Sequence, residues 1–245
     1  MHPILFKIWP ITVYSYGFAL AGAFIIGFFL LTAELERKKI ETGFAYDLVL
    51  AAIIGGVIGA RFFYVLAHLD YFSKYPLQIF FIQEGLVFYG GLAGGTLAVL
   101  SVVYRKKLPV SKIADAVAPC LAIGTAIGRI GCFLNGCCYG KPTNIFWAVK
   151  FPGVPLTRHP TQIYDLIYNL IIFCIIWSLR KKINKDGMIF WFYLFFYSIG
   201  RFSVEFFRVS ALVLWGLTMA QIISIGLFLV SLMILLKKYS LLNFY

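Results

Sequence analysis

Four arginines of this chain lie within long apolar segments, where a positive charge is costly. They are Arg61, Arg129, Arg201 and Arg208. A charged side chain at the centre of a bilayer costs roughly 2.5–3.5 kcal/mol on insertion scales, so such residues mark functional sites more often than scaffolding. A guanidinium matches two phosphate oxygens at once. If the four arginines converge near one membrane surface, they predict a site for an anionic lipid headgroup.

The segment YSIGRFSVEFFR predicts a helix with four notable residues on one face. They are Tyr197, Arg201, Glu205 and Arg208, spaced by four, four and three residues. Arg201 and Glu205 can pair at i,i+4, and a purely structural ion pair is one interpretation of both. Arg208 would then remain as a spare positive charge, as binding of an anion requires.

The run GTAIGRIGCFLNGCCYG places Arg129, Cys132 and Gly136 on one helix face. Asn135 is an amide within an apolar span and must find hydrogen-bond partners. Gly140 and the other glycines of this run allow backbone or lipid to approach closely. The alternative is a helix-packing seam that contains one structural arginine.

Five cysteines divide into two groups. Cys120 and Cys174 lie in apolar spans and are most simply small core residues. Cys132, Cys137 and Cys138 cluster at the end of a span, where a disulfide is conceivable in an oxidising compartment. The spacing C-x4-C-C matches no common zinc or redox motif, and no histidine is close in sequence. We therefore expect no metal site and no cofactor.

Several aromatic residues are ambiguous. Tyr89 stands beside a Gly-Gly pair and Tyr16 begins an apolar segment, but tyrosine is also common at membrane interfaces. Arg61 and Tyr64 share a face of another predicted helix. His159, before Pro160, fits a turn into a span as well as it fits a catalytic role.

The elements that carry these residues are apolar helices. Hydrophobic residues make up 61% of the chain, and its mean hydropathy is +0.88. Continuous apolar runs of about 20 residues are typical of membrane-spanning helices. Seven such runs predict an all-α polytopic membrane protein with a single domain over residues 1–245. They cover residues 12–33, 46–68, 86–104, 113–135, 161–179, 187–208 and 216–236.

Basic residues predict the orientation of the seven segments. Thirteen lysines and arginines fall in loops on one side of the predicted membrane and five on the other. The positive-inside rule makes the richer side cytoplasmic, with the N-terminus outside and the C-terminus inside. The same rule accounts for most of the net charge of +12, so we expect no binding of nucleic acid. The N-terminal residues predict no removed signal peptide.

Six segments, in this order, resemble the prolipoprotein diacylglyceryl transferase family along nearly the whole chain. They are YGFAL, GGLAGG, VSKIADAVAP, GRIGCFLNGCCYG, HPTQIYD and RFSVEFFR. The most specific is GRIGCFLNG, which resembles the family signature Gly-Arg-x-Gly-Asn-Phe-x-Asn-Gly-Glu. The resemblance implies a seven-helix fold in the bacterial inner membrane, with an external N-terminus and an active site toward the outer face.

The resemblance also implies an activity and its partners. Members of the family transfer the diacylglyceryl group of phosphatidylglycerol to the lipobox cysteine thiol of a secreted prolipoprotein, and they release glycerol phosphate. The expected partners are therefore phosphatidylglycerol, the signal peptide that contains the lipobox cysteine, and membrane lipid.

Residue by residue, the resemblance implies two sets of site residues. As catalytic residues we expect Arg129, Arg201 and Tyr89. As substrate-binding residues we expect Arg129, Asn135, Gly136, Gly140, Glu205, Arg208, Arg61, Tyr16 and Tyr197.

Three positions depart from the family pattern. Cys132 replaces the signature asparagine, Cys137 replaces the glutamate, and Tyr89 replaces a histidine. Tyrosine, with a pKa of about 10, is a poor base at neutral pH compared with histidine at about 6.5. Two hypotheses therefore stand: an active transferase in which the cysteines only shape the cavity beside Arg129, and a diverged lipid-binding or thiol-redox membrane homologue.

Overall fold

The computed structural model describes residues 1–9, 11–80 and 85–240, and this part of the chain contains seven long helices. Each lies on one of the seven apolar segments. They are α1 (Ser15–Arg37), α2 (Phe44–Ala67), α4 (Phe88–Arg105), α5 (Val110–Asn135), α6 (Thr161–Leu179), α7 (Met188–Glu205) and α8 (Met219–Ser240). The short helices α3 (Leu69–Phe72) and η1 (Pro76–Phe80) follow α2.

Five of the long helices are long and apolar enough to cross a membrane. They are α1, α2, α5, α6 and α8. The chain is thus a largely helical protein with several candidate membrane spans. The count of seven spans and the orientation of the two ends stay predictions.

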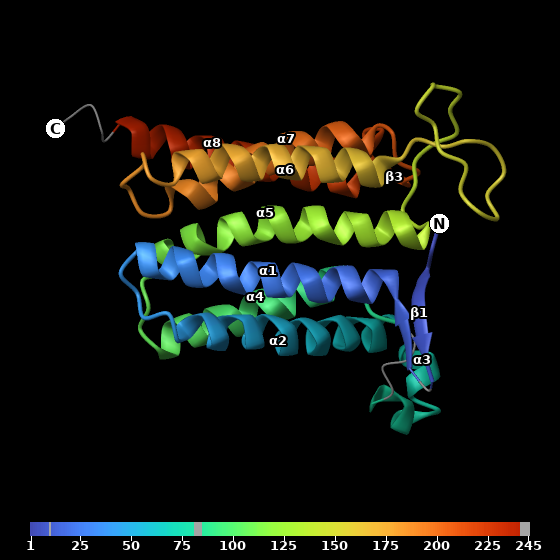
Figure 1. Ribbon diagram of the computed structural model, residues 1–245, viewed down its shortest axis with the longest axis horizontal. Coiled ribbons are helices and arrows are strands. Elements are labelled where there is room, and N and C mark those ends of the chain that lie inside the picture. Colours follow the sequence, from blue (N-terminus) through green and yellow to red (C-terminus); the bar gives the residue numbers. More distant parts are fainter. Residues whose placement is uncertain (10, 81–84, 241–245) are drawn as a thin grey trace. The chain divides into compact units, whose positions relative to one another are not determined.

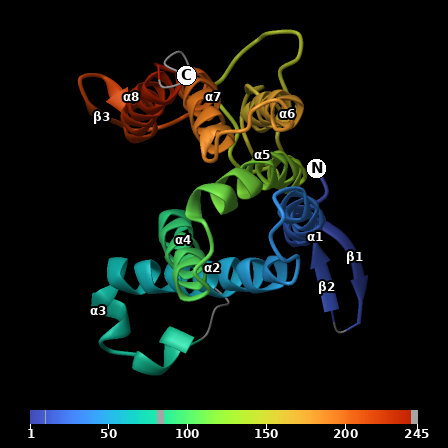
Figure 2. The ribbon, with the colours of Figure 1, turned by 90° about the vertical axis from the view of Figure 1, so that its left-hand side faces the viewer.

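Two short antiparallel hairpins depart from the purely helical fold that we expected. Strand β1 (Ile4–Ile8) pairs with β2 (Ile11–Tyr14), which leads into α1 (Figure 2). Strand β3 (Leu212–Leu214) pairs with β4 (Leu217–Thr218). Its turn consists of Trp215 and Gly216, which both have positive φ, as two-residue hairpin turns of the primed type require.

The chain divides into two compact units. One contains residues 31–113, and the other contains residues 1–30 and 114–245. In the unit 31–113, α2 packs along α4 (Figure 1). A methyl group at Gly59 would collide with the carbonyl oxygen of Gly90, and one at Gly94 with that of Gly55. Glycine at these positions allows the two helix backbones to touch.

In the other unit, α6, α7 and α8 lie side by side (Figure 1). Apolar residues of α6 and α7 form a core with two alanines of α5. They are Ile172, Ile176, Ile189, Tyr193, Ala118 and Ala122. Buried Asp115 of α5 accepts hydrogen bonds from the backbone amides of Gly187 (2.8 Å) and Phe190 (3.0 Å) at the start of α7. A carboxylate stabilises a helix N-terminus, so this contact fixes α7 against α5.

Candidate active site

A single buried carboxylate, Asp165 of α6, lies at the centre of the site. Its Oδ2 atom is 3.0 Å from Nε of Arg129 and 3.2 Å from Nη1 of Arg208. The Asp165 side chain has no exposed surface. Because a buried carboxylate is stable only when it is paired, Asp165 draws an arginine of α5 and an arginine beyond α7 to one point.

The polar face of α6 explains how this helix reaches the arginines. Gln162, Asp165 and Asn169 are spaced by three and four residues, so they share one face, and all three are fully buried. The Asn169 amide donates a hydrogen bond to the backbone carbonyl of Asp165 (2.8 Å). This face therefore turns toward the protein, because lipid could not satisfy these groups.

A second carboxylate, Glu205, closes the cluster from α7. Nη1 of Arg201 lies 2.8 Å from Oε2 of Glu205, so the pair expected from the i,i+4 spacing is present. The Thr218 hydroxyl of β4 donates to Oε1 of Glu205 (3.1 Å), and Nε of Arg208 lies 3.8 Å from Oε2. We expected Arg208 within the helix, but α7 ends at Glu205 and Arg208 follows its last turn.

The cluster has one positive charge more than its carboxylates balance. Three guanidiniums face two carboxylates, and the arginine side chains keep 17–21% of their surface exposed. Nη1 of Arg201 has no hydrogen-bond partner among the described residues, because its contact with Glu205 is close but poorly aligned. The arrangement can thus accept one further monovalent anion. Guanidiniums suit phosphate oxygens in that role.

Gly136 directs the chain after α5 into a short loop with three cysteines. It has φ +73°, its amide bonds to the Phe133 carbonyl (3.1 Å), and the Cys137 amide bonds to the Cys132 carbonyl (3.2 Å). These two bonds form the Schellman motif that ends a helix at a left-handed glycine. The role of Gly136 in the structure is therefore to end α5. A contact with substrate stays a prediction.

The first turn of α6 holds this loop in place. The Thr161 hydroxyl donates to the Cys138 carbonyl (2.8 Å), and the Gln162 amide donates to the Cys137 carbonyl (2.5 Å). Asn135, an exposed residue at the end of α5, hydrogen-bonds the Cys137 thiol with its side chain.

The three thiols of the loop lie together beside the arginines. The Sγ atoms of Cys132, Cys137 and Cys138 are all within 4.8 Å of one another, and the described cysteines are free of disulfides. Hydrogen bonding from Cys132, then from Cys137, and the positive charges of Arg208 and Arg129 lower the pKa of the Cys138 thiol. Burial raises the pKa of the Cys137 thiol.

Gly140 positions Arg208 by a close crossing of two backbones. A methyl group there would collide with the Phe207 carbonyl oxygen, and Gly140 pairs with Arg208 in an isolated antiparallel bridge. The next amide, of Lys141, donates to the Phe207 carbonyl (2.8 Å). The predicted substrate contact of Gly140 is therefore better described as backbone support for an arginine.

Of the two predicted tyrosines, Tyr16 approaches Arg129, whereas Tyr197 packs against other tyrosines. Tyr16 is the second residue of α1 and lies close to Arg129 and Cys132. Gly131 allows this approach, since a methyl group there would come within 3.2 Å of the Tyr16 Cα atom. Tyr197 lies one turn before Arg201, with its ring 5.7 Å from that of Tyr193.

Arg61 and Tyr89 belong to the unit 31–113. The Arg61 guanidinium donates to the carbonyls of Gln78 (2.6 Å), Ile79 (3.0 Å) and Gly85 (3.3 Å). These bonds indicate that Arg61 holds the chain after α3. Tyr89 is 55% exposed at the start of α4. The substrate role of Arg61 and the catalytic role of Tyr89 stay predictions.

Sequence reasoning missed Asp165. A signal was present, because the segment HPTQIYD places a carboxylate in the first turns of an apolar span, where it must be paired.

The histidine of the same segment, His159, supports the turn into α6. The His159 carbonyl accepts from the amides of Gly140 and Thr161 (2.9 Å each), which favours the turn over the catalytic alternative.

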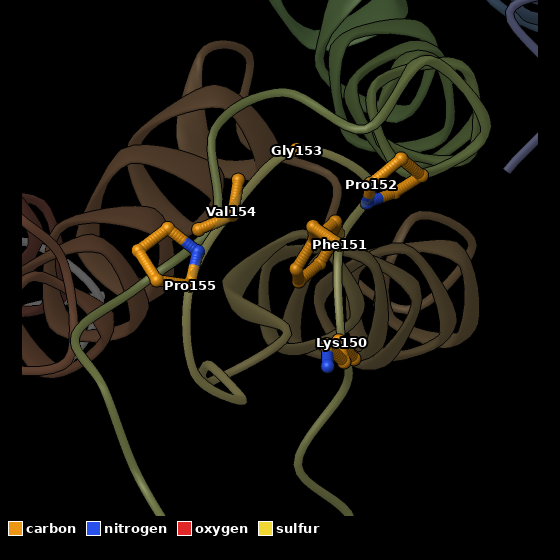
Figure 3. Close-up of a pocket in the computed structure, with 6 residues that line it drawn as sticks. All are labelled: Lys150, Phe151, Pro152, Gly153, Val154 and Pro155. Atoms are coloured by element: carbon orange, nitrogen blue, oxygen red, sulfur yellow. The ribbon is translucent and has the colours of Figure 1, made fainter.

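The long loop between α5 and α6 also borders a shallow, open hollow, which is not this site. Six consecutive residues, Lys150–Pro155, line it (Figure 3). None of them belongs to the arginine cluster. Buried Phe151 instead anchors the loop, since its ring lies 5.1 Å from that of Tyr139 and 6.2 Å from that of Phe133.

The fold and the site define a class: a helical membrane protein with a partly exposed cluster of arginines and carboxylates between its helices. Residues 3–237 match the family model of prolipoprotein diacylglyceryl transferase. The chain belongs to this family.

Named relatives agree with that assignment. A phosphatidylglycerol–prolipoprotein diacylglyceryl transferase of Clostridium tetani is 34% identical over 214 residues, which cover 85% of this chain and 86% of the relative. A protein of the same name from Trichormus variabilis is 35% identical over 91% of this chain and 84% of its own length. One from Bordetella parapertussis is 34% identical over 93% and 91%.

Proposed function

We propose that this chain transfers the diacylglyceryl group of phosphatidylglycerol to the cysteine thiol of a prolipoprotein. The names of its relatives supply the reaction class. The net charge of the arginine cluster is the observation that supports placing the reaction there. Arg129, Arg201 and Arg208 stand against two carboxylates, Asp165 and Glu205. The surplus of one positive charge equals the single negative charge of the phosphodiester in phosphatidylglycerol.

The reaction needs a thiolate and a stabilised leaving group. The sulfur attacks the glyceryl carbon that bears the phosphate ester, an S–C bond forms, and the C–O bond to phosphate breaks. The electron pair passes to the phosphate oxygen, so glycerol phosphate leaves with one negative charge more than the diester had. Arginines already held in place by Asp165 and Glu205 stabilise that charge without reorganising.

Within this proposal, Arg129 and Arg201 bind the phosphate and are the catalytic residues. Arg208 and Glu205 complete the cluster. Tyr16 and Tyr197 line its approach from α1 and α7. Tyr89 is the least supported member of the predicted catalytic set, because a tyrosine hydroxyl is a poor base at neutral pH.

The proposal also includes a location. The distribution of basic residues favours a multi-pass protein of the bacterial inner membrane, with the cluster toward the outer face, where secreted prolipoproteins and their lipobox cysteines arrive. Labelling of introduced cysteines by an impermeant thiol reagent tests the orientation. Position 144 should react in intact cells and position 182 should not, and the reverse pattern would contradict the orientation.

A direct assay tests the function. The purified protein is incubated with phosphatidylglycerol and a peptide that contains a lipobox cysteine, and mass spectrometry measures the mass gained by the peptide. We expect a diacylglyceryl adduct with the wild type and with Arg105→Ala, an exposed arginine outside the cluster. We expect none with Arg201→Ala. Equal transfer by both variants would remove the phosphate role of the cluster.

A further inference from the structure

The loop after α5 holds three sulfur atoms at distances suited to a single metal ion. The Sγ atoms of Cys132, Cys137 and Cys138 all lie within 4.8 Å of one another, and those of Cys137 and Cys138 are 3.6 Å apart. Zinc bound by thiolates at about 2.3 Å in tetrahedral geometry separates its sulfurs by roughly 3.8 Å. Small side-chain rotations would therefore complete the site.

The backbone of this loop is held in place as a metal site requires. Fully buried Thr161 and Gln162 bind the carbonyls of Cys138 and Cys137. Cys138 has φ +63°, a left-handed conformation that is uncommon for a non-glycine residue and concentrates at functional sites. Residues that hold the metal ligands by hydrogen bonds, without touching the metal themselves, are a regular feature of metal sites. The meeting of the three sulfurs thus follows from the fold and not from chance rotamers.

We propose that Cys132, Cys137 and Cys138 bind one Zn²⁺ ion as thiolates, and that its fourth position takes the cysteine thiol of the prolipoprotein. Structural zinc sites have four protein ligands, whereas catalytic sites have three and leave one position open. Among the described residues, the sulfur cluster contains only these three potential metal ligands. The inference rests on the proposed transfer reaction.

Two arginines lie beside the proposed zinc site. Three thiolates and Zn²⁺ carry one net negative charge, and a fourth thiolate adds another. Arg129 and Arg208 interact electrostatically with Cys138, so they lie close enough to offset part of this charge. The zinc site and the phosphate site would then share arginines, which brings the nucleophile beside the lipid headgroup.

A bound zinc ion would make a general base for the prolipoprotein thiol unnecessary. A thiol bound to a metal loses its proton outright, and here the proton passes to solvent. The carboxylates of the cluster, Asp165 and Glu205, are already engaged in ion pairs with arginines. The bound thiolate attacks the glyceryl carbon as described above, and zinc keeps its oxidation state. The product is a neutral thioether, a weaker ligand that can leave.

Metal analysis is the first test. Protein purified from zinc-supplemented cells should contain about one zinc per chain by elemental mass spectrometry. Triple replacement of Cys132, Cys137 and Cys138 by serine should remove it. Cys174→Ser, an exposed cysteine in the middle of α6, is the matched control and should retain it. A monodisperse detergent complex of each variant shows that it remains folded, and single Cys138→Ser should weaken zinc binding at least tenfold if the triple variant does not fold.

Cobalt spectroscopy tests the fourth ligand directly. Co²⁺ in the site should give a sulfur-to-cobalt charge-transfer band. Addition of the lipobox peptide should strengthen that band by about one third, because a fourth thiolate joins three. The same peptide with serine in place of its cysteine should leave the band unchanged.

Each contrary result is distinct. Absence of zinc, a disulfide between two of the three cysteines, or a cobalt band that does not change when the peptide is added overturns the proposal. A disulfide would favour a thiol-redox role.

Chelation of zinc should reduce transfer about 100-fold, and Zn²⁺ but not Mg²⁺ should restore it. Full transfer by the zinc-free protein overturns the zinc site and leaves the transferase standing. Coordination of the peptide without transfer from phosphatidylglycerol overturns the transferase and leaves the zinc site standing.

Discussion

Arg61 and Arg129 look alike in sequence, since each is a lone positive charge in an apolar helix after a run of glycines, but their partners differ. Arg61 is 8% exposed and donates to three backbone carbonyls. Arg129 is partly exposed and pairs with Asp165, a carboxylate that also binds Arg208. The first guanidinium holds a chain segment, and the second is part of a charged cluster.

The difference shows what makes a buried arginine available for a ligand. Backbone carbonyls that accept from a buried guanidinium occupy its donors, so these donors are not open to a ligand. A carboxylate shared by two arginines holds both in position and balances only one of them. Availability for an anion therefore follows from the balance of charge and from partial exposure, not from the presence of arginine alone.

Removal of the Arg129 guanidinium is expected to have the largest effect. Arg129→Ala should reduce transfer by about 10²–10³-fold, the loss typical when one donor to a developing anion is removed. Arg129→Lys should restore little, because an ammonium cannot reproduce the two-pronged contact. Transfer is measured with the peptide assay on variants that accumulate in membranes at the wild-type level. Loss of the protein itself, with normal activity in what remains, would assign Arg129 a structural role.

Neutralisation of the shared carboxylate tests the organisation of the cluster. Asp165→Asn leaves Arg129 and Arg208 without their common partner, so the free energy of unfolding should fall by about 3 kcal/mol or more, as when buried pairs lose one member. Transfer should fall tenfold to 100-fold. Thermal unfolding in detergent and the peptide assay measure the two effects. Asp70→Asn, at an exposed position, is the control, and equal stability of both variants would contradict the central place of Asp165.

The support of Arg208 by Gly140 predicts a smaller effect. Gly140→Ala forces the backbone away from Phe207, so Arg208 should shift and KM for phosphatidylglycerol should rise about tenfold with a smaller change in kcat. Gly124→Ala is the matched control, because a methyl group there meets no atom within 4 Å. An unchanged KM in both variants would show that Gly140 does not support Arg208 in binding phosphatidylglycerol.

The smallest effect on chemistry is expected at Arg61. Arg61→Ala should lower the thermal stability and the amount of protein in membranes, since three carbonyls lose their donor. Transfer per folded molecule should stay within about threefold of the wild type. A loss as large as that of Arg129→Ala would return Arg61 to the predicted phosphate site.

The sequence predicted the seven long helices well because each is a continuous apolar run. It did not predict the hairpins, whose strands have five residues or fewer and merge with the apolar segments. Asp165 was not predicted because its partners Arg129 and Arg208 are distant in sequence, and only the packing of α6 brings them together. The meeting of the three thiols depends on the left-handed Cys138 and on bonds from α6, which no spacing along the chain reveals.

Retention of lipid by the purified protein tests the account most directly. Native mass spectrometry compares phosphatidylglycerol with phosphatidylethanolamine, whose headgroup is zwitterionic, at equal concentrations. The account predicts a preference for phosphatidylglycerol of about tenfold in the wild type and in Arg61→Ala, and its loss in Arg129→Ala. An equal preference in all three proteins would contradict a phosphate site built on Arg129 and Asp165.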